Sequence, residues 1–546
     1  MQEFHEHRRA TAWARKSLGA VADSPRDTAG AADATEFRIS AGDRLRIDAL
    51  ETGRLYRHVT GIDHEARLMT PQELAELGDP MATVLFRRNI FPMTVQELLA
   101  ALPQPTTPSQ QAVYLISEAG QIPPDTAPGL HRDIRFAITR CVQGRDVDLL
   151  VSTGANADPA TTFLQVAAWD PIAKVFNYYM RITPTWVWAG NSWSALAPGS
   201  RGNGCFDSHI NGSVVMKELR QPWLNWQSQA ATIQLAPDDP LRGDPLYQQV
   251  SGAQNLELTV RSLVSRWTAA RLAAVTADGT IEHPDHLLRH LFTTTSVNLT
   301  SSATQSATIT PTGDDLPLPA GLWLNNDALL DDLALPATAS LPLAPASRYV
   351  DSLTTFGFRL EEKAGGFSRT GDSFFAFVTP EAAYEDNDVV RQMVQQAIIP
   401  AKFAACALMV DFTNPVFSTD RARLMAYVPT APTAVAALSD RIVQAILAAA
   451  AKLPATSPEA RFAAAWNLTD NSWATTFAQR IDTYLGHVTA RIRTPSGFDD
   501  YVRLAESRRR EFRAMRLNEF ELTLPVTDIP ADAPRLTMLE DATVTP

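Results

Sequence analysis

The stretch TFLQVAAWDPIAKVFNYYMRI, Thr162–Ile182, decides the fold class. Its two halves are rich in aromatic and β-branched side chains, a composition that favours extended strands. Between them stands Asp170-Pro171, a dipeptide that favours the start of a turn. The stretch therefore predicts two antiparallel strands joined by a turn.

A period of two continues on the N-terminal side of this stretch. Ile134, Phe136 and Ile138 alternate with polar neighbours, and Leu149 and Val151 continue the pattern. Alternation interrupted by turn signals is typical of an antiparallel meander with one face buried. We expect a β-rich core within residues 111–300.

Helical periodicity appears after this region and dominates beyond Tyr384. Leu256, Val260, Leu263 and Trp267 recur at helical spacing, and a short helix is expected to begin at Pro284. The expected fold class is α+β, with an antiparallel β-rich central region and a mainly helical C-terminal third.

A chain of 546 residues is long enough for roughly two to four domains. Proline-rich and Ser/Thr-rich breaks divide it into six expected segments. These are a flexible N-terminal arm (1–35), a mixed α/β segment (36–110), the β-rich core (111–300), a linker and hairpin region (301–380), a helical region (381–525) and an extended tail (526–546).

Composition narrows the classes of protein. The net charge of −12 argues against a general affinity for nucleic acid or anionic membranes. No run of about 18 apolar residues is present, and the first residues lack the apolar core of a secretory signal. Three cysteines suit a reducing compartment. We expect a soluble, cytoplasmic protein with a small-molecule ligand, and the sequence leaves its oligomeric state open.

Several common catalytic motifs are missing from the sequence. It has no P-loop and no dinucleotide-binding glycine motif, so no nucleotide cofactor is indicated. The H-E-x-x-H, C-x-x-C and G-x-S-x-G patterns are also missing, which excludes the most frequent zinc and hydrolase signatures.

Tryptophan is concentrated in one part of the chain. Six of the eleven tryptophans lie between Trp169 and Trp226, and Trp186 and Trp188 would share one face of a strand. Such a wall could stack on an aromatic ligand, a sugar or a porphyrin, or it could simply form core. The predicted substrate contacts are Trp186, Trp188, Trp193, Arg201 and Tyr179.

A glycine-rich loop, PGSRGNGCFDSHINGS at 198–213, follows the tryptophans. Asp207 and His209 are two residues apart, so on a strand they would face the same side and could hold a metal. Cys205 is a candidate thiol nucleophile, with His209 and Asn191 as partners, although papain-like enzymes carry these residues in another order. The predicted catalytic residues are Asp207, His209 and Cys205; the alternative is a structural turn capped by Asp207.

The segment EHPDHLLRHLF, 282–292, contains three of the ten histidines. His286 and His290 would lie one helical turn apart, with His283 just before them and Asp285 or Glu282 as a carboxylate. The alternative is that these histidines form the solvated face of an amphipathic helix.

Two further segments have simpler expected roles. The arginines of ESRRREFRAMR, among them Arg508 and Arg509, are expected on a solvated helix face with glutamate partners. MVDFTNPVFS, 409–418, is expected to be a buried strand that runs into a turn.

These observations lead to one leading hypothesis. His209 and one or two of His283, His286 and His290 would bind iron or zinc, and an open position would activate water or oxygen against an aromatic or apolar substrate. Oxidoreductase chemistry is favoured over hydrolysis. The alternatives are a non-catalytic binding protein for a sugar, pigment or peptide, and an enzyme with non-covalent haem.

Overall fold

The computed structural model describes residues 50–119, 125–130, 134–155, 162–182, 185–301, 309–362, 366–370, 375–515 and 524–546. The chain forms two compact units. Unit 1 comprises Met1–Leu115, Asp133–Val215 and Gly243–Ser251, and unit 2 comprises Ile116–Arg132, Met216–Arg242 and Gly252–Pro546. The expected N-terminal arm lies outside the described residues, and the boundaries of the six expected segments stay predictions.

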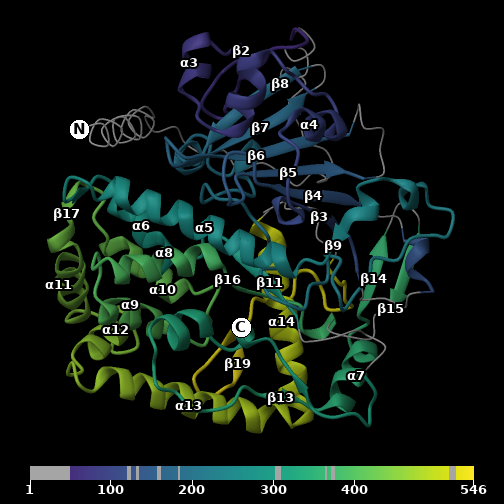
Figure 1. Ribbon diagram of the computed structural model, residues 1–546. Helices are drawn as coiled ribbons and strands as arrows, with labels where there is room; N and C mark the ends of the chain where they lie inside the picture. The colour runs from purple at the N-terminus through teal and green to yellow at the C-terminus, as the bar shows by residue number, and fades with distance from the viewer. Residues whose placement is uncertain are drawn as a thin grey trace. The chain divides into compact units, whose positions relative to one another are not determined.

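Unit 1 is built on a nine-stranded sheet (Figure 1) with the order β2-β1-β8-β7-β6-β5-β4-β3-β9. Its strands are β1 (Leu55–Arg57), β2 (Arg67–Leu68), β3 (Gln111–Ile116), β4 (Arg135–Arg140), β5 (Leu149–Gly154), β6 (Leu164–Asp170), β7 (Val175–Ile182), β8 (Thr185–Asn191) and β9 (Val250–Ser251). Strands β4 to β8 pair antiparallel in chain order. β1 pairs parallel with β8 and β3 with β9, so the sheet is mixed rather than wholly antiparallel as expected.

The predicted turn at Asp170 joins β6 and β7. The carboxylate Oδ1 of Asp170 accepts hydrogen bonds from the backbone N–H groups of Ile172 and Ala173, both at 2.9 Å. This is the local side-chain bonding that makes aspartate favourable at the start of a turn. The two strands then pair with Val166 opposite Tyr179, which confirms the interpretation of Thr162–Ile182.

Two short helices of unit 1 follow a Thr-x-x-Glu spacing in the sequence, at Thr70 and Thr94, a pattern that predicts the start of a helix. They are α3 (Pro71–Glu76) and α4 (Val95–Ala101). Thr70 accepts from the backbone N–H of Glu73, whose carboxylate accepts in return from the N–H of Thr70. This reciprocal arrangement is the capping box expected from the spacing.

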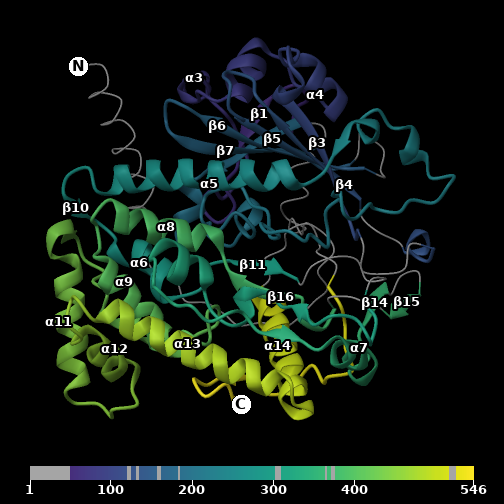
Figure 2. The ribbon, with the colours of Figure 1, turned by 60° about the horizontal axis from the view of Figure 1, so that its bottom comes forward.

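Unit 2 is rich in helices (Figures 1 and 2). Its helices are α5 (Gln254–Val275), α6 (Pro284–Phe292), α7 (Ala346–Thr355), α8 (Tyr384–Gln395), α9 (Ala401–Leu408), α10 (Thr419–Arg423), α11 (Leu438–Ala450), α12 (Pro458–Trp466), α13 (Trp473–Ile492) and α14 (Pro495–Met515). Helix α8 packs against both α5 and α6. Among the described residues, no helix combines the length and the apolar character needed to cross a bilayer.

Short two-stranded pairs accompany these helices in unit 2. They are β10 (Thr280–Ile281) with β17 (Thr433–Ala434), β11 (Val297–Thr300) with β16 (Thr379–Ala382), β12 (Leu316–Pro317) with β13 (Leu343–Ala344), β14 (Arg359–Glu362) with β15 (Phe367–Thr370), and β18 (Thr537–Met538) with β19 (Val544–Thr545). The large mixed sheet and the helices together make an α+β class plausible. The last third of the chain contains α8 to α14 and also short strands.

The expectation for the arginines of α14 is wrong for two of them. Arg508 is 3 % exposed and Arg509 is fully buried. Arg509 forms a 2.6 Å ion pair with Glu506 and donates to the carbonyls of Ala376 and Val378. A buried guanidinium is tolerated when its charge is paired and its N–H groups find acceptors, and here Glu506 supplies the charge while Nε and Nη1 have acceptors.

The expectation of a strand at 409–418 is also wrong. Met409–Asp411 is a turn of 3-10 helix that continues directly from α9, because the alanine-rich sequence before it has high helix propensity. Asp411 accepts hydrogen bonds from Asn414 Nδ2 at 2.8 Å and Ser418 Oγ at 2.6 Å.

Candidate functional site

Helix α6 begins where the sequence predicts and divides into two sides. Pro284 occupies the first turn, where its fixed φ favours helix formation and its missing N–H is not needed. Leu287, Leu288, Leu291 and Phe292 are buried in the core. His283, Asp285 and His286 lie at the half-buried N-terminal end of the helix.

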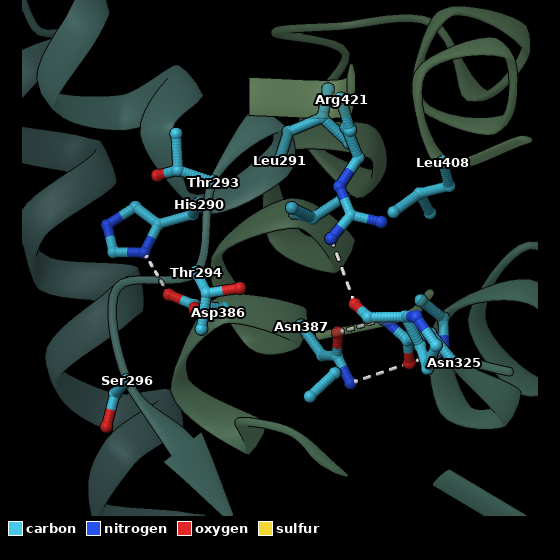
Figure 3. Close-up of a pocket in the computed structure, with 14 residues that line it drawn as sticks. His290, Leu291, Thr293, Thr294, Ser296, Asn325, Asp386, Asn387, Leu408 and Arg421 are labelled. Carbon is cyan, nitrogen blue, oxygen red and sulfur yellow. Dashed lines mark hydrogen bonds and ion pairs between the residues drawn. The ribbon is translucent and has the colours of Figure 1, made fainter. Parts of the chain in front are cut away.

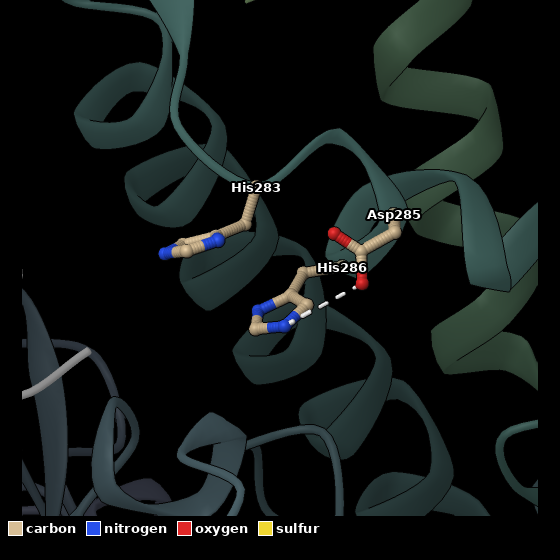
Figure 4. A group of neighbouring side chains, drawn as sticks. All are labelled: His283, Asp285 and His286. Carbon is tan, nitrogen blue, oxygen red and sulfur yellow. Dashed lines mark ion pairs between the residues drawn. The ribbon is translucent and has the colours of Figure 1, made fainter. Parts of the chain in front are cut away.

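These three residues form what we call the α6 ligand group: His283, Asp285 and His286. One potential ligand atom from each lies within 4.8 Å of the other two. The two imidazole rings stack with their centroids 4.9 Å apart and their planes at 21°, and Asp285 Oδ2 lies 3.7 Å from His286 Nε2 (Figure 4). The ring of His283 makes no hydrogen bond to any residue that the structure describes. The structure thus brings together two of the predicted metal ligands and one of the two carboxylates considered with them.

A cation already stands beside this group. Arg289 Nη2 lies 3.6 Å from Asp285 Oδ2, one helical turn away. Burial lowers the pKa of Arg289, and the nearby carboxylates of Asp285 and Asp386 oppose that change. Arginine remains charged under such conditions. Arg289 would therefore compete with a metal ion for the carboxylate of Asp285.

His290, the third histidine of the segment, lies outside the α6 ligand group. Its side chain is fully buried, and Nδ1 lies 2.6 Å from Oδ1 of Asp386 (Figure 3). Its Nε2 lies 2.9 Å from Nη1 of Arg271, while Nη2 of Arg271 donates to the backbone carbonyl of His286 at 2.8 Å. Asp386 also accepts from the backbone N–H of Thr295 at 3.1 Å. This network connects α5, α6 and α8 directly behind the α6 ligand group.

The predicted aromatic wall lies in the interior of unit 1. Trp186, Trp188, Trp193 and Tyr179 are each at most 4 % exposed. Trp186 Nε1 donates to the carbonyl of Pro92 at 2.7 Å, and its ring lies 5.9 Å from that of Phe86. Buried indoles with satisfied N–H groups are the arrangement expected of core. Their role as substrate contacts stays a prediction.

Tyr179 also belongs to a buried carboxylate network in unit 1. Its hydroxyl donates to Asp79 Oδ2 at 2.7 Å, and Asn177 Nδ2 donates to the same oxygen at 2.9 Å. Burial raises the pKa of Asp79 to about 7, and the hydrogen bonds from Tyr179, Ala82 and Asn177 oppose that rise. Asp79 is therefore a fully buried acid close to its titration point at neutral pH.

The glycine loop is half-buried and irregular. Gly204–Phe206 forms a 3-10 turn, and Asp207 and His209 follow it outside any strand, so the expected strand geometry is wrong. Glycines allow the tight path of this loop: a Cβ on Gly212, at φ +78°, would lie 2.4 Å from the carbonyl oxygen of Ser192. Arg201 is half-buried in the same loop.

The polar residues of the loop have identified surroundings. His209 Nδ1 lies 2.8 Å from the carbonyl oxygen of Ser213, and its ring lies 4.9 Å from that of Tyr178. Burial raises the pKa of Asp207 to about 6. Burial, together with the charge of Asp207, raises the pKa of the Cys205 thiol to about 12. A thiol of that kind is protonated at neutral pH and is a poor nucleophile.

Two side chains of the loop, Phe206 and His209, and the two strand tryptophans lie on opposite faces of the sheet. Tyr178 contacts His209 and Phe206, whereas the next residue, Tyr179, lies opposite Trp188 on the other face. Successive side chains of a strand point to opposite faces, so the structure does not bring His209 and the two strand tryptophans together. His209 belongs to unit 1 and the histidines of α6 to unit 2, and a site shared by them stays a prediction.

Sequence patterns gave no signal for Arg271 and Asp386. Arg271 lies 19 residues before His290 and Asp386 lies 96 residues after it. Asp386 stands in the acidic run YEDND, which resembles the first turn of a solvated helix. Only the packing of α8 against α6 reveals its partner.

Comparison with known proteins gives no relative: no family model, no curated protein and no solved structure matches the chain. The function must be argued from the described residues alone.

Proposed function

We propose that the α6 ligand group binds a divalent transition-metal ion and that the chain is a metal-dependent enzyme acting on a small molecule. The observation that carries this proposal is the convergence of His283, Asp285 and His286 within 4.8 Å. Imidazole nitrogen and carboxylate oxygen are ligands that zinc and iron both accept.

The geometry of the group is close to that of a bound site. Metal–nitrogen and metal–oxygen bonds of about 2.0–2.2 Å place neighbouring ligand atoms of a tetrahedral site about 3.4 Å apart. Side-chain rotations that move the ligand atoms by about 1 Å would bring the α6 ligand group to that spacing, and no described residue holds the ring of His283 by a hydrogen bond. Three protein ligands leave coordination positions open for water or a substrate.

We favour iron and oxidoreductase chemistry for this site. Two imidazoles and one carboxylate with open positions form the ligand set of non-haem iron oxygenases. The same set with zinc would activate water for hydrolysis, which is the alternative reaction class. An aromatic or apolar substrate remains part of the proposal.

Two local features limit the affinity. The N-terminal end of a helix carries partial positive charge, which opposes a cation in the first turn of α6. Arg289 adds a full charge 3.6 Å from Asp285. The carboxylate of Asp285 offsets both, so we expect binding of intermediate strength.

The test is metal binding by the full chain. Metal is removed with 1,10-phenanthroline, and Fe(II), Co(II) or Zn(II) is added back in separate titrations without oxygen. We expect one equivalent to bind, with a Co(II) absorption spectrum typical of nitrogen and oxygen ligands. His283→Ala, Asp285→Asn and His286→Ala should each weaken binding at least tenfold. His487→Ala changes an exposed histidine of α13 and is the matched control.

The outcomes separate the alternatives. Equal binding by the wild-type chain and the three ligand variants would refute the proposed site. A Soret band in the purified protein would favour the haem alternative. A colourless protein that takes up none of the three metals would favour non-catalytic binding.

A further inference from the structure

Arg289 stands next to the α6 ligand group and shares its access to solvent. It lies three residues after His286 and four after Asp285, so the three side chains lie on one face of α6. The side chains of Asp285, His286 and Arg289 are each between 21 % and 25 % exposed. A small molecule in solvent therefore has access to the guanidinium and to the ligand group together.

The contacts of Arg289 leave most of its hydrogen-bonding capacity unused. Its Nε donates to the backbone carbonyl of Asp285 at 3.4 Å, and Nη2 lies 3.6 Å from Oδ2 of the same residue, beyond hydrogen-bond distance. No other residue that the structure describes accepts a hydrogen bond from this guanidinium. An arginine side chain presents a planar fork of N–H donors, which matches the two oxygens of a carboxylate. Arg289 can therefore bind such an acceptor without giving up its contact with Asp285.

The charge balance around α6 changes sign when a metal ion binds. The charged groups here are those of the segment 282–292, with its histidines neutral, together with the two charged side chains that contact His290. They are three carboxylates and two guanidiniums: Glu282, Asp285, Asp386, Arg271 and Arg289. Without metal this set has an excess of one negative charge, and a divalent ion turns that into an excess of one positive charge. The metal-bound site therefore attracts an anion, and a monoanion restores neutrality.

We propose that the substrate of the α6 ligand group is a carboxylic acid, whose carboxylate lies between the bound metal ion and Arg289. This inference rests on the proposed function, because without the metal there is no excess of positive charge. A carboxylate has two oxygens, so one can occupy an open metal position while the other accepts from the guanidinium. Arg289 holds the substrate by this end, and the rest of the substrate is the aromatic or apolar body already proposed.

Arg289 then has opposite effects on the metal alone and on the metal with substrate. Alone, its charge repels a cation that approaches Asp285, 3.6 Å away. With a carboxylate between them, the guanidinium and the metal ion both lie beside a negative charge, and their repulsion is reduced. Metal and carboxylate should therefore bind cooperatively, and each should strengthen the binding of the other by the same factor.

The test measures this coupling in the full chain. Metal is removed with 1,10-phenanthroline, the chelator is dialysed away, and Co(II) is titrated without oxygen at constant ionic strength, with and without millimolar benzoate or acetate. We expect both carboxylates to lower the dissociation constant of Co(II) at least about fivefold, and benzyl alcohol, which has no charge, to leave it unchanged. Weak complexes between Co(II) and carboxylates in solution act in the opposite direction, because they remove free metal.

Variants assign the coupling to Arg289. Arg289→Gln should lose it, so that benzoate changes the dissociation constant of Co(II) less than twofold. The affinity of this variant for Co(II) alone shows whether its metal site is intact. Arg289→Lys keeps the charge without the planar fork and should retain part of the coupling. Arg493→Gln, which changes an exposed arginine paired with Asp315, should behave like the wild type.

The outcomes separate this inference from the proposed function. A wild-type chain that binds no Co(II) would refute the metal site and, with it, the carboxylic acid substrate. Co(II) binding that carboxylates leave unchanged, or equal coupling in the wild type and Arg289→Gln, would overturn the carboxylic acid substrate alone. A larger effect of phenyl phosphate than of benzoate would also overturn it, and would identify phosphate esters as the substrate class.

Discussion

Arg271 donates a hydrogen bond to His290, with Nη1 lying 2.9 Å from Nε2. Because an arginine side chain has donors and no acceptor, Nε2 of the imidazole must be the acceptor. Nδ1 then carries the proton and donates to Asp386 at 2.6 Å. The ring is thereby held in one neutral tautomer between a buried cation and a buried anion. Both of its nitrogens are committed, which explains why His290 takes no place in the α6 ligand group.

Replacing His290 should destabilise unit 2 strongly. His290→Ala would leave the charges of Arg271 and Asp386 buried and separated, and we expect the free energy of unfolding to fall by about 3–5 kcal/mol. Chemical denaturation monitored by circular dichroism measures the change. His290→Gln retains one donor and one acceptor, so it should lose less. An equal loss in the two variants would show that packing of the ring, not its hydrogen bonds, matters.

Removing the competing cation should strengthen metal binding. Arg289→Gln eliminates the charge 3.6 Å from Asp285, so Asp285 becomes a better ligand. We expect the dissociation constant for Co(II) or Zn(II) to fall several-fold. Arg266→Gln, on α5 in the same unit, controls for the loss of one positive charge. Weaker binding in Arg289→Gln would mean that Arg289 positions Asp285 rather than competing for it.

The stability of the chain should depend on pH through Asp79. Its folded pKa of about 7 lies above the value of about 4 for an unfolded aspartate. Between these values the folded chain holds a proton that the unfolded chain has released, so the free energy of unfolding falls as the pH rises through this range. The expected slope is on the order of 1 kcal/mol per pH unit near pH 5–6.

Comparison with Asp79→Asn isolates this effect. Burial also raises the pKa of Glu218 to about 7 and the pKa values of Asp207 and Asp332 to about 6, so the wild-type curve contains their contributions too. Denaturation at pH 5, 6, 7 and 8 should give a shallower dependence in the variant. Identical slopes in the two proteins would rule out Asp79 as the titrating group.

The cysteines should be inert in the folded chain. Burial raises the pKa of Cys205 and that of Cys406 to about 12, and Cys141 is buried. We expect iodoacetamide at pH 7.5 to modify none of the three within an hour, and all three after denaturation, as counted by mass spectrometry. Rapid modification of Cys205 alone would instead support the thiol nucleophile considered from the sequence.

Local patterns predicted the parts of the fold that depend on local interactions. The Asp170 turn, the capping box of Thr70 and the start of α6 at Pro284 each rest on residues within a few positions of one another. The residues of the α6 ligand group could be picked out from the sequence for the same reason, because they lie within four consecutive positions at one end of a helix. The competing contact between Arg289 and Asp285 also follows from local spacing, because residues four apart on a helix are neighbours.

Features that depend on distant contacts escaped prediction. The arginines of α14 have glutamates nearby in sequence, as surface helices do, and only the carbonyls of Ala376 and Val378, more than 130 residues earlier, show that Arg509 is buried. The parallel partners of β3 and β8 were likewise invisible, because β9 and β1 are too short to show a period. His209 packs on one face of β7, and the strand tryptophans lie on the other. This separation follows from the pairing register of β7 with β8, which the sequence does not show.

The edge strand β9 has a consequence for biosynthesis. The polypeptide passes from one unit to the other at 115/116, 132/133, 215/216, 242/243 and 251/252, and Val250–Ser251 is the last piece of the large sheet to be made. Almost half of the protein must be synthesised before β3 can pair with its parallel neighbour, β9. Nascent chains that stop short of Val250 would expose the unpaired backbone of β3, a template for aggregation. Neither unit is one continuous segment of the chain, so expression of isolated fragments should yield insoluble material.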